Sequence, residues 1–129
     1  MYLAFDLETT QRLQLGKLRQ SLGVSCAATL LGGAREPVLW YGGTNRNRPS
    51  KRMNRLELQE LVDYLDRQVE RGYKIVTWNG LSFDFNVLAQ DSGMFDECRR
   101  LAIDHIDMMF HVLCRLGYGI SLNSAAKGM

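Results

Sequence analysis

What the sequence lacks excludes several classes of protein. None of its three cysteines, Cys26, Cys98 and Cys114, stands in a Cys-x-x-Cys pair, so neither a zinc site nor a disulfide framework is indicated, and free thiols in a reducing compartment are expected. No apolar run approaches the roughly 20 residues that a membrane-spanning helix needs. Because the first residues also lack a basic signal-peptide segment, we expect a cytoplasmic protein with no membrane partner.

The sequence also has little net charge, although charged residues make up an ordinary 23% of it. The net charge of +2 over 129 residues is too small to indicate a nucleic-acid partner by itself. The sequence contains no internal repeat and no low-complexity segment, and hydrophobic residues make up 46% of it, which is enough for a core. We therefore expect a single domain over residues 1–129.

Three segments have the pattern of β-strands. Residues 2–8 alternate, with Leu3, Phe5 and Leu7 on one face and the remaining residues, acids included, on the other. Residues 24–31 and 37–42 are further apolar runs, and Gly32-Gly33 between them indicates a tight turn. Short connections between these strands favour an antiparallel three-strand meander.

The rest of the chain alternates between helix and strand patterns. A helix is predicted over 54–71, where apolar residues recur on one face before Gly72, and a short strand over 74–78. A second helix, capped by Ser82, is expected to reach Gln90, and a third to cover 94–101. Residues 102–113 fit strand or helix equally. A meander followed by helical crossovers predicts an α/β fold with a mixed sheet whose later strands are parallel, flanked by helices.

Two acids interrupt the first strand. Asp6 and Glu8 share a face, about 7 Å apart along the strand. Side-by-side carboxylates repel each other, and a hard cation such as Mg²⁺ or Mn²⁺ would relieve that repulsion. The alternative is a strand whose polar face meets water.

A third acid stands between two aromatic residues. Asp84 lies between Phe83 and Phe85 at the expected start of a helix, where an acid is favoured by the helix dipole. Two interpretations of Asp84 therefore remain open: a metal ligand, or an acid that simply begins a helix. Asn79, at the end of the preceding strand, is either a turn former or a polar contact to substrate.

Together these segments resemble a known family. Phe5-Asp6-Leu7-Glu8-Thr9 is similar to the first motif of the DEDD superfamily of 3′–5′ exonucleases. Asn79-Gly80-Leu81-Ser82-Phe83-Asp84 is similar to the second motif, in the form seen in proofreading domains of family-B DNA polymerases and related stand-alone exonucleases. The resemblance implies a ribonuclease H-like fold.

The resemblance also implies a chemistry. Asp6, Glu8 and Asp84 would be the catalytic residues and would hold two Mg²⁺ or Mn²⁺ ions about 3.5–4 Å apart. These ions would activate a water and stabilise the leaving 3′ oxygen, so the substrate would be the 3′ end of single-stranded DNA or RNA.

Four further residues are implied as substrate contacts. Leu7 and Thr9 belong to the first motif and would approach the terminal nucleotide. Asn79 and Phe83 would contact the strand, although Phe83 is equally well explained as a core residue. The sequence does not choose between DNA and RNA.

The family's third motif adds a fourth Asp on a late helix, with a Tyr or His shortly before it. Residues 121–129 are similar to the stretch that precedes this motif, and no acid follows Asp107. The expected domain is thus incomplete at its C-terminal end, which would leave an apolar sheet face open for a possible homo-oligomer. We expect Asp107 to bind backbone groups, and His105 and His111 to be hydrogen-bonded in the fold.

A basic cluster follows the third strand. It comprises Arg46, Arg48, Lys51, Arg52 and Arg55, with no acid between them. Arg48, Lys51 and Arg52 are candidates for contacts to phosphates. The alternative is an ordinary solvated loop.

Two other functions share this fold. One is a non-catalytic nucleic-acid-binding or protein-interaction module, which would not digest nucleic acid. The other is a structure-specific endonuclease, which would release larger fragments rather than mononucleotides.

Overall fold

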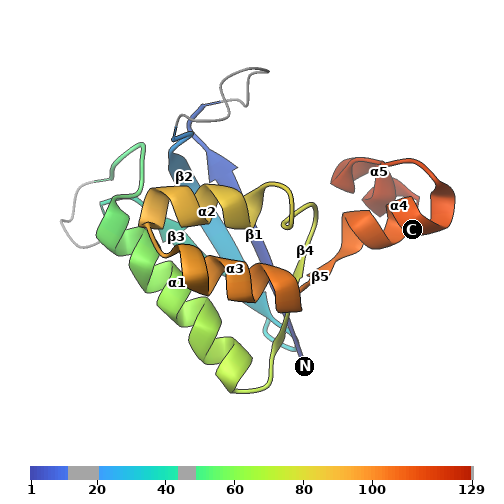
Figure 1. The fold of residues 1–129 in the computed structure, drawn as a ribbon, viewed down its shortest axis with the longest axis horizontal. Coiled ribbons are helices and arrows are strands. Elements are labelled where there is room, and N and C mark those ends of the chain that lie inside the picture. The colour runs from blue at the N-terminus through green and yellow to red at the C-terminus, as the bar shows by residue number, and fades with distance from the viewer. Residues whose placement is uncertain (12–20, 44–48, 129) are drawn as a thin grey trace.

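The computed structural model describes residues 1–11, 21–43 and 49–128. Five strands form one mixed sheet in the order β3-β2-β1-β4-β5 (Figure 1). They are β1 (Tyr2–Thr9), β2 (Val24–Leu31), β3 (Val38–Tyr41), β4 (Lys74–Thr77) and β5 (Ile106–Asp107). β1, β2 and β3 form the expected antiparallel meander, while β4 runs parallel to β1 and β5 parallel to β4. The α/β fold is confirmed, and the strand order is consistent with a ribonuclease H-like topology.

The central strand β1 separates two different faces. Leu3, Phe5 and Leu7 are at most 3% exposed and belong to the hydrophobic core. Residues between them point to the opposite face and are exposed. The alternation in the sequence therefore sets both the orientation of the strand and the face on which Asp6 and Glu8 lie.

Three helices cover the core face of the sheet. They are α1 (Arg55–Glu70), α2 (Asp84–Ser92) and α3 (Phe95–Asp104), which lie in front of the sheet in Figure 1. Two more, α4 (Met108–Leu116) and α5 (Leu122–Lys127), extend beyond β5 and bury no residue. No helix in the described residues is long and apolar enough to cross a membrane.

The helix predicted over 54–71 is confirmed as α1. Asn54 caps it, and the Glu57 side chain accepts the Asn54 N–H in return, which completes a capping box. Gly72, after the helix, has φ +90°, a conformation that glycine adopts readily.

The prediction that Ser82 caps the second helix was wrong. α2 begins at Asp84, with Phe83 in the capping position and no side-chain cap. The carbonyl of Ser82 instead accepts a hydrogen bond from Asn86 Nδ2 at 3.1 Å.

The bounds of two other elements also differ from the prediction. The third helix reaches Asp104 rather than ending at residue 101, and the third strand is shorter than expected.

The ambiguous segment 102–113 contains both elements. β5 occupies two residues of it and α4 begins directly afterwards. Asp107 caps α4, as expected for a backbone-binding acid. The Nδ1 atom of His105 lies 2.6 Å from the Ala102 carbonyl oxygen, which fits the expected structural role of this histidine, and His111 is exposed.

Association through an apolar face stays a prediction, which sedimentation at several concentrations tests.

A first prediction concerns Glu57, which is 3% exposed. Its carboxylate accepts the N–H of Asn54 at 2.7 Å and that of Gly43 at 2.8 Å. We expect Glu57→Ala to lower the free energy of unfolding by about 2–3 kcal/mol, because two donors lose a charged acceptor. Urea denaturation measures this. The exposed Glu60→Ala in the same helix should change it by less than about 0.5 kcal/mol; equal effects would contradict the account.

Candidate functional site

The candidate site begins where β4 separates from β1. The two strands pair only along Tyr2–Ala4, because β4 ends at Thr77 and the chain then turns towards α2. Beyond Ala4 this edge of β1 has no strand partner among the described residues. There the N–H of Leu7 donates to Oδ1 of Asp84 at 3.0 Å. The two parallel strands thus diverge at their carboxyl ends, the end of a sheet where ligands usually bind in α/β folds.

A tight turn carries the chain from β4 to α2. Asn79 has φ +67°, a left-handed conformation that Asn tolerates better than most residues. The N–H of Gly80 donates to Thr77 Oγ1 at 3.0 Å. A Cβ atom added at Gly80 would lie 2.6 Å from Thr77 Cβ, so only glycine fits here. The turn leads into α2, whose first residue, Asp84, is held at β1 by the Leu7 N–H.

The Asp84 carboxyl group is buried and electrostatically unfavourable. The residue is 2% exposed, and burial raises its pKa to about 7, opposed by the Leu7 N–H and reinforced by the negative charge of Asp6 and, more weakly, of Asp107. Asp84 is therefore only partly ionised near neutral pH, because its surroundings disfavour the charged form.

Asp6 and Glu8 lie on the exposed face of β1. Desolvation raises the pKa of Asp6, and the negative charge of Glu8 raises it further, against a backbone hydrogen bond from Leu7. Ion pairs among the described residues join Arg52 to Asp91, Lys74 to Asp104 and Arg100 to Asp66. None of these pairs neutralises the three acids of the site.

The chemistry of these donors fits a hard divalent cation. Carboxylate oxygens are preferred ligands of Mg²⁺ and Mn²⁺. A cation would stabilise the charged forms of Asp6 and Asp84, which burial and, to a smaller extent, neighbouring negative charges disfavour. Across residues 1–11, 21–43 and 49–128, no three His, Cys, Asp or Glu side chains already form a complete metal-binding group. The three acids supply the donors, and their side chains would have to turn towards a shared ion.

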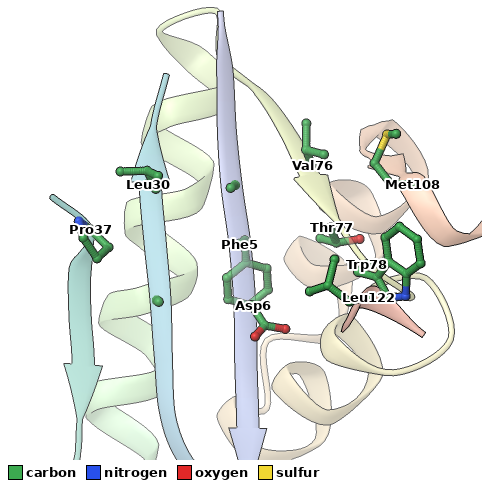
Figure 2. A pocket seen from close by; sticks show the side chains of 11 residues that line it. Phe5, Asp6, Leu30, Pro37, Val76, Thr77, Trp78, Met108 and Leu122 are labelled. Atoms are coloured by element: carbon green, nitrogen blue, oxygen red, sulfur yellow. The ribbon is translucent and has the colours of Figure 1, made fainter. Parts of the chain in front are cut away.

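Two hollows flank Asp6 on the exposed sheet face. The larger has a volume of about 380 Å³ and is almost wholly apolar. Figure 2 shows Asp6 among its lining side chains, with Leu30 on one side and Val76 and Trp78 on the other. The smaller, of about 190 Å³, is lined by Asp6, Glu8 and Tyr41 among others. Asp6 therefore lies between the two depressions, and Glu8 lines the smaller one.

The register of the sheet places an aromatic side chain in the same cross-strand row as Glu8, two strands away. Glu8 lies opposite Cys26 on β2, and Cys26 lies opposite Tyr41 on β3, so all three share the exposed face. Tyr41 is 49% exposed. Sequence reasoning missed Tyr41 and Trp78, since their proximity to the acids depends on strand order and register.

The predicted substrate contacts occupy different environments. The side chain of Leu7 is 3% exposed, so this residue offers the site its N–H rather than its side chain. Thr9 Oγ1 donates to the Gln11 carbonyl at 2.7 Å. Phe83 is partly buried and packs against the core, which supports its reading as a core residue. Asn79 is partly exposed in the turn.

The basic cluster is described only in part. Arg46 and Arg48 lie outside the described residues, whereas Lys51 and Arg52 are exposed. Arg52 Nη2 donates to Ser21 Oγ at 2.5 Å and lies 3.9 Å from Asp91 Oδ1. A Cβ added at Gly23 would lie 2.6 Å from Thr10 Oγ1 and 3.0 Å from Arg52 Nε. Arg52 is thus near the end of β1 that carries the acids.

Comparison with known proteins adds no assignment. The chain matches no protein-family model, and searches of curated proteins and of solved structures find no significant match.

A second prediction follows from the raised pKa of Asp84. Its folded pKa of about 7 exceeds the ordinary value of 3.8, so the folded state binds this proton more tightly than the unfolded state. The resulting stability is fully present below pH 4 and is lost as the pH rises through 7. Relative to Asp84→Asn, the wild type should lose about 2–3 kcal/mol of unfolding free energy between pH 5 and pH 8.5.

Urea denaturation with a chelator at both pH values measures this difference. The asparagine keeps an oxygen for the Leu7 N–H, so the fold should persist. Asp63, an exposed acid on α1, provides the control Asp63→Asn, whose stability should follow the wild type at both pH values. A difference between wild type and Asp84→Asn that does not change with pH would refute the raised pKa.

Proposed function

We propose that the chain is a metal-dependent 3′–5′ exonuclease that hydrolyses single-stranded DNA or RNA. The observation that carries this proposal is the set of three acids, Asp6, Glu8 and Asp84, near the carboxyl end of β1. Burial and neighbouring negative charge disfavour the charged forms of Asp6 and Asp84, and no ion pair in the described residues neutralises any of the three. Buried or paired acids that cost stability are common where a site needs them for chemistry. The resemblance to the first two DEDD motifs points to the same residues.

Three acids would hold the cations. Asp6 and Glu8 are fixed by the rigid central strand, and Asp84 is oriented by the Leu7 N–H. When bound, the cations would lower the pKa of an attacking water and stabilise the charge on the phosphate and the departing 3′ oxygen. In the reaction the water oxygen bonds to phosphorus and the bond to the 3′ oxygen breaks. The products are a 5′-mononucleotide and a strand with a new 3′ hydroxyl.

The surface around the acids suits a single strand. Tyr41 and Trp78 lie on opposite sides of Asp6 and offer aromatic surface for stacking on bases. Such stacking tolerates any base and either sugar, so the proposal covers both DNA and RNA. Lys51 and Arg52 would contact the phosphate backbone.

A third prediction is the direct test of this function. We expect the wild-type chain with Mn²⁺ to shorten 5′-labelled single-stranded DNA or RNA from the 3′ end and to release mononucleotides. Asp84→Asn should lower the rate by at least about 100-fold, because a metal ligand is lost. This variant is expected to be more stable than the wild type at pH 8, so lost activity cannot be ascribed to unfolding. Asp63→Asn should digest like the wild type.

The outcomes separate the competing functions. Fragments longer than mononucleotides would favour an endonuclease. Strand binding without any digestion, by wild type and Asp84→Asn alike, would favour the non-catalytic module. Digestion by Asp84→Asn at the wild-type rate would contradict the proposed role of the three acids.

A fourth prediction concerns the phosphate contacts. We expect the double variant Lys51→Ala, Arg52→Gln to bind a single strand more weakly, and the slope of log affinity against log salt to fall by about 1.4, or roughly 0.7 for each lost contact. Fluorescence anisotropy at several salt concentrations measures the slope.

The matched control is Arg67→Ala, Arg99→Ala, which removes two exposed cations from α1 and α3. It should leave the slope unchanged. If both double variants lower the slope equally, the effect reports net charge and not a binding surface.

A further inference from the structure

Asp107 makes more hydrogen bonds than a helix cap requires. Its Oδ1 atom accepts the N–H of Met109 at 3.1 Å and of Phe110 at 3.3 Å, which is the ordinary capping of α4. Its carboxylate also accepts the N–H of Asn79 at 2.9 Å and that of Leu81 at 3.1 Å. These two donors lie in the turn between β4 and α2, which leads into Asp84.

The sheet brings Asp107 to this turn. Thr77, the last residue of β4, pairs with Asp107 on β5. The carboxylate therefore projects at the point where β4 ends and the turn begins. Two N–H groups on either side of Gly80 are directed at the two oxygens of one side chain.

These bonds hold a conformation that the turn does not favour by itself. Asn79 has φ +67°, which costs conformational energy for any residue with a side chain. Trp78, directly before this turn, lines the larger hollow beside Asp6, and Asp84 follows the turn at the start of α2. Within the turn, Leu81 is 47% exposed. A fixed acceptor for both N–H groups keeps this exposed segment in one place.

We propose that Asp107 is a positioning residue of the site, which holds the Asn79–Leu81 turn in place to receive the substrate strand. This inference rests on the proposed function. The Asp107 carboxylate accepts four backbone N–H groups, three at Oδ1 and one at Oδ2. It acts on the substrate through the turn.

The structure separates this role from metal binding. Asp84 is anchored by the N–H of Leu7 on β1 and not by Asp107. Loss of the Asp107 contacts should therefore loosen the turn while the acids stay in position. The expected signature is a raised KM for the strand with kcat and Mn²⁺ affinity preserved.

Two substitutions isolate the turn contacts. Serine is a good helix cap but is too short to reach the turn, so Asp107→Ser keeps α4 capped and removes both turn bonds. Asp107→Asn keeps one oxygen for the Asn79 N–H but turns an amide NH₂ towards the Leu81 N–H. Asp104→Asn is the control, since this exposed acid lies on the same segment and its only ion pair within the described residues is with Lys74.

The experiment measures strand digestion with Mn²⁺, Mn²⁺ affinity and backbone amide exchange on each full chain. In Asp107→Ser we expect the amides of Asn79 and Leu81 to exchange roughly tenfold faster and KM to rise roughly tenfold, with kcat and Mn²⁺ affinity within about twofold of the wild type. Asp107→Asn should show amide exchange rates and a KM between those of Asp107→Ser and the wild type. Asp104→Asn should match the wild type in every measurement.

The result that overturns the inference is a wild-type KM in Asp107→Ser, or a loss of kcat and Mn²⁺ affinity with KM unchanged. The wild-type arm tests the proposed function separately. A wild-type chain that neither digests nor binds a strand removes the proposed function and this inference together, whereas an active wild type with an indistinguishable Asp107→Ser removes this inference alone.

Discussion

One hydrogen bond, from the N–H of Leu7 to Oδ1 of Asp84, joins the two halves of the candidate site. It exists because β4 pairs with β1 only as far as Ala4, which leaves the Leu7 N–H without a strand partner there. The bond brings a carboxyl group from α2 against the central strand and buries it. Burial makes the charged form of Asp84 unfavourable, so this acid costs stability at neutral pH, and packing alone does not account for it.

The remaining parts of the site are arranged around this bond. The exposed face of β1 presents Asp6 and Glu8 next to it, and the apolar hollows on each side of Asp6 provide surface for a flexible polymer. The turn that precedes Asp84 is held from the other side by the Asp107 carboxylate. A rigid strand, a helix start and an anchored turn thus fix three acids and their surroundings through separate contacts.

Local patterns in the sequence were sufficient to predict β1, β2 and α1, because alternation and helical spacing are properties of neighbouring residues. The acids were also found in this way, since Asp6 and Glu8 interrupt an apolar strand. The burial of Asp84 was not predictable, because it depends on where β4 leaves β1. The expected Ser82 cap failed because the turn continues to Phe83. The dual role of Asp107 requires the pairing of β5 with β4, which no local pattern reveals.

The measurement that tests the central claim most directly is calorimetric titration of the chain with Mn²⁺ at pH 6.5, in two buffers of different ionisation enthalpy. Because Asp84 has a pKa of about 7 without a cation, Mn²⁺ that binds the three acids must displace a proton, and the observed enthalpy should depend on the buffer. Asp84→Asn should weaken binding and abolish the buffer dependence. Equal affinity and equal proton release in wild type and Asp84→Asn would contradict a metal site at these acids.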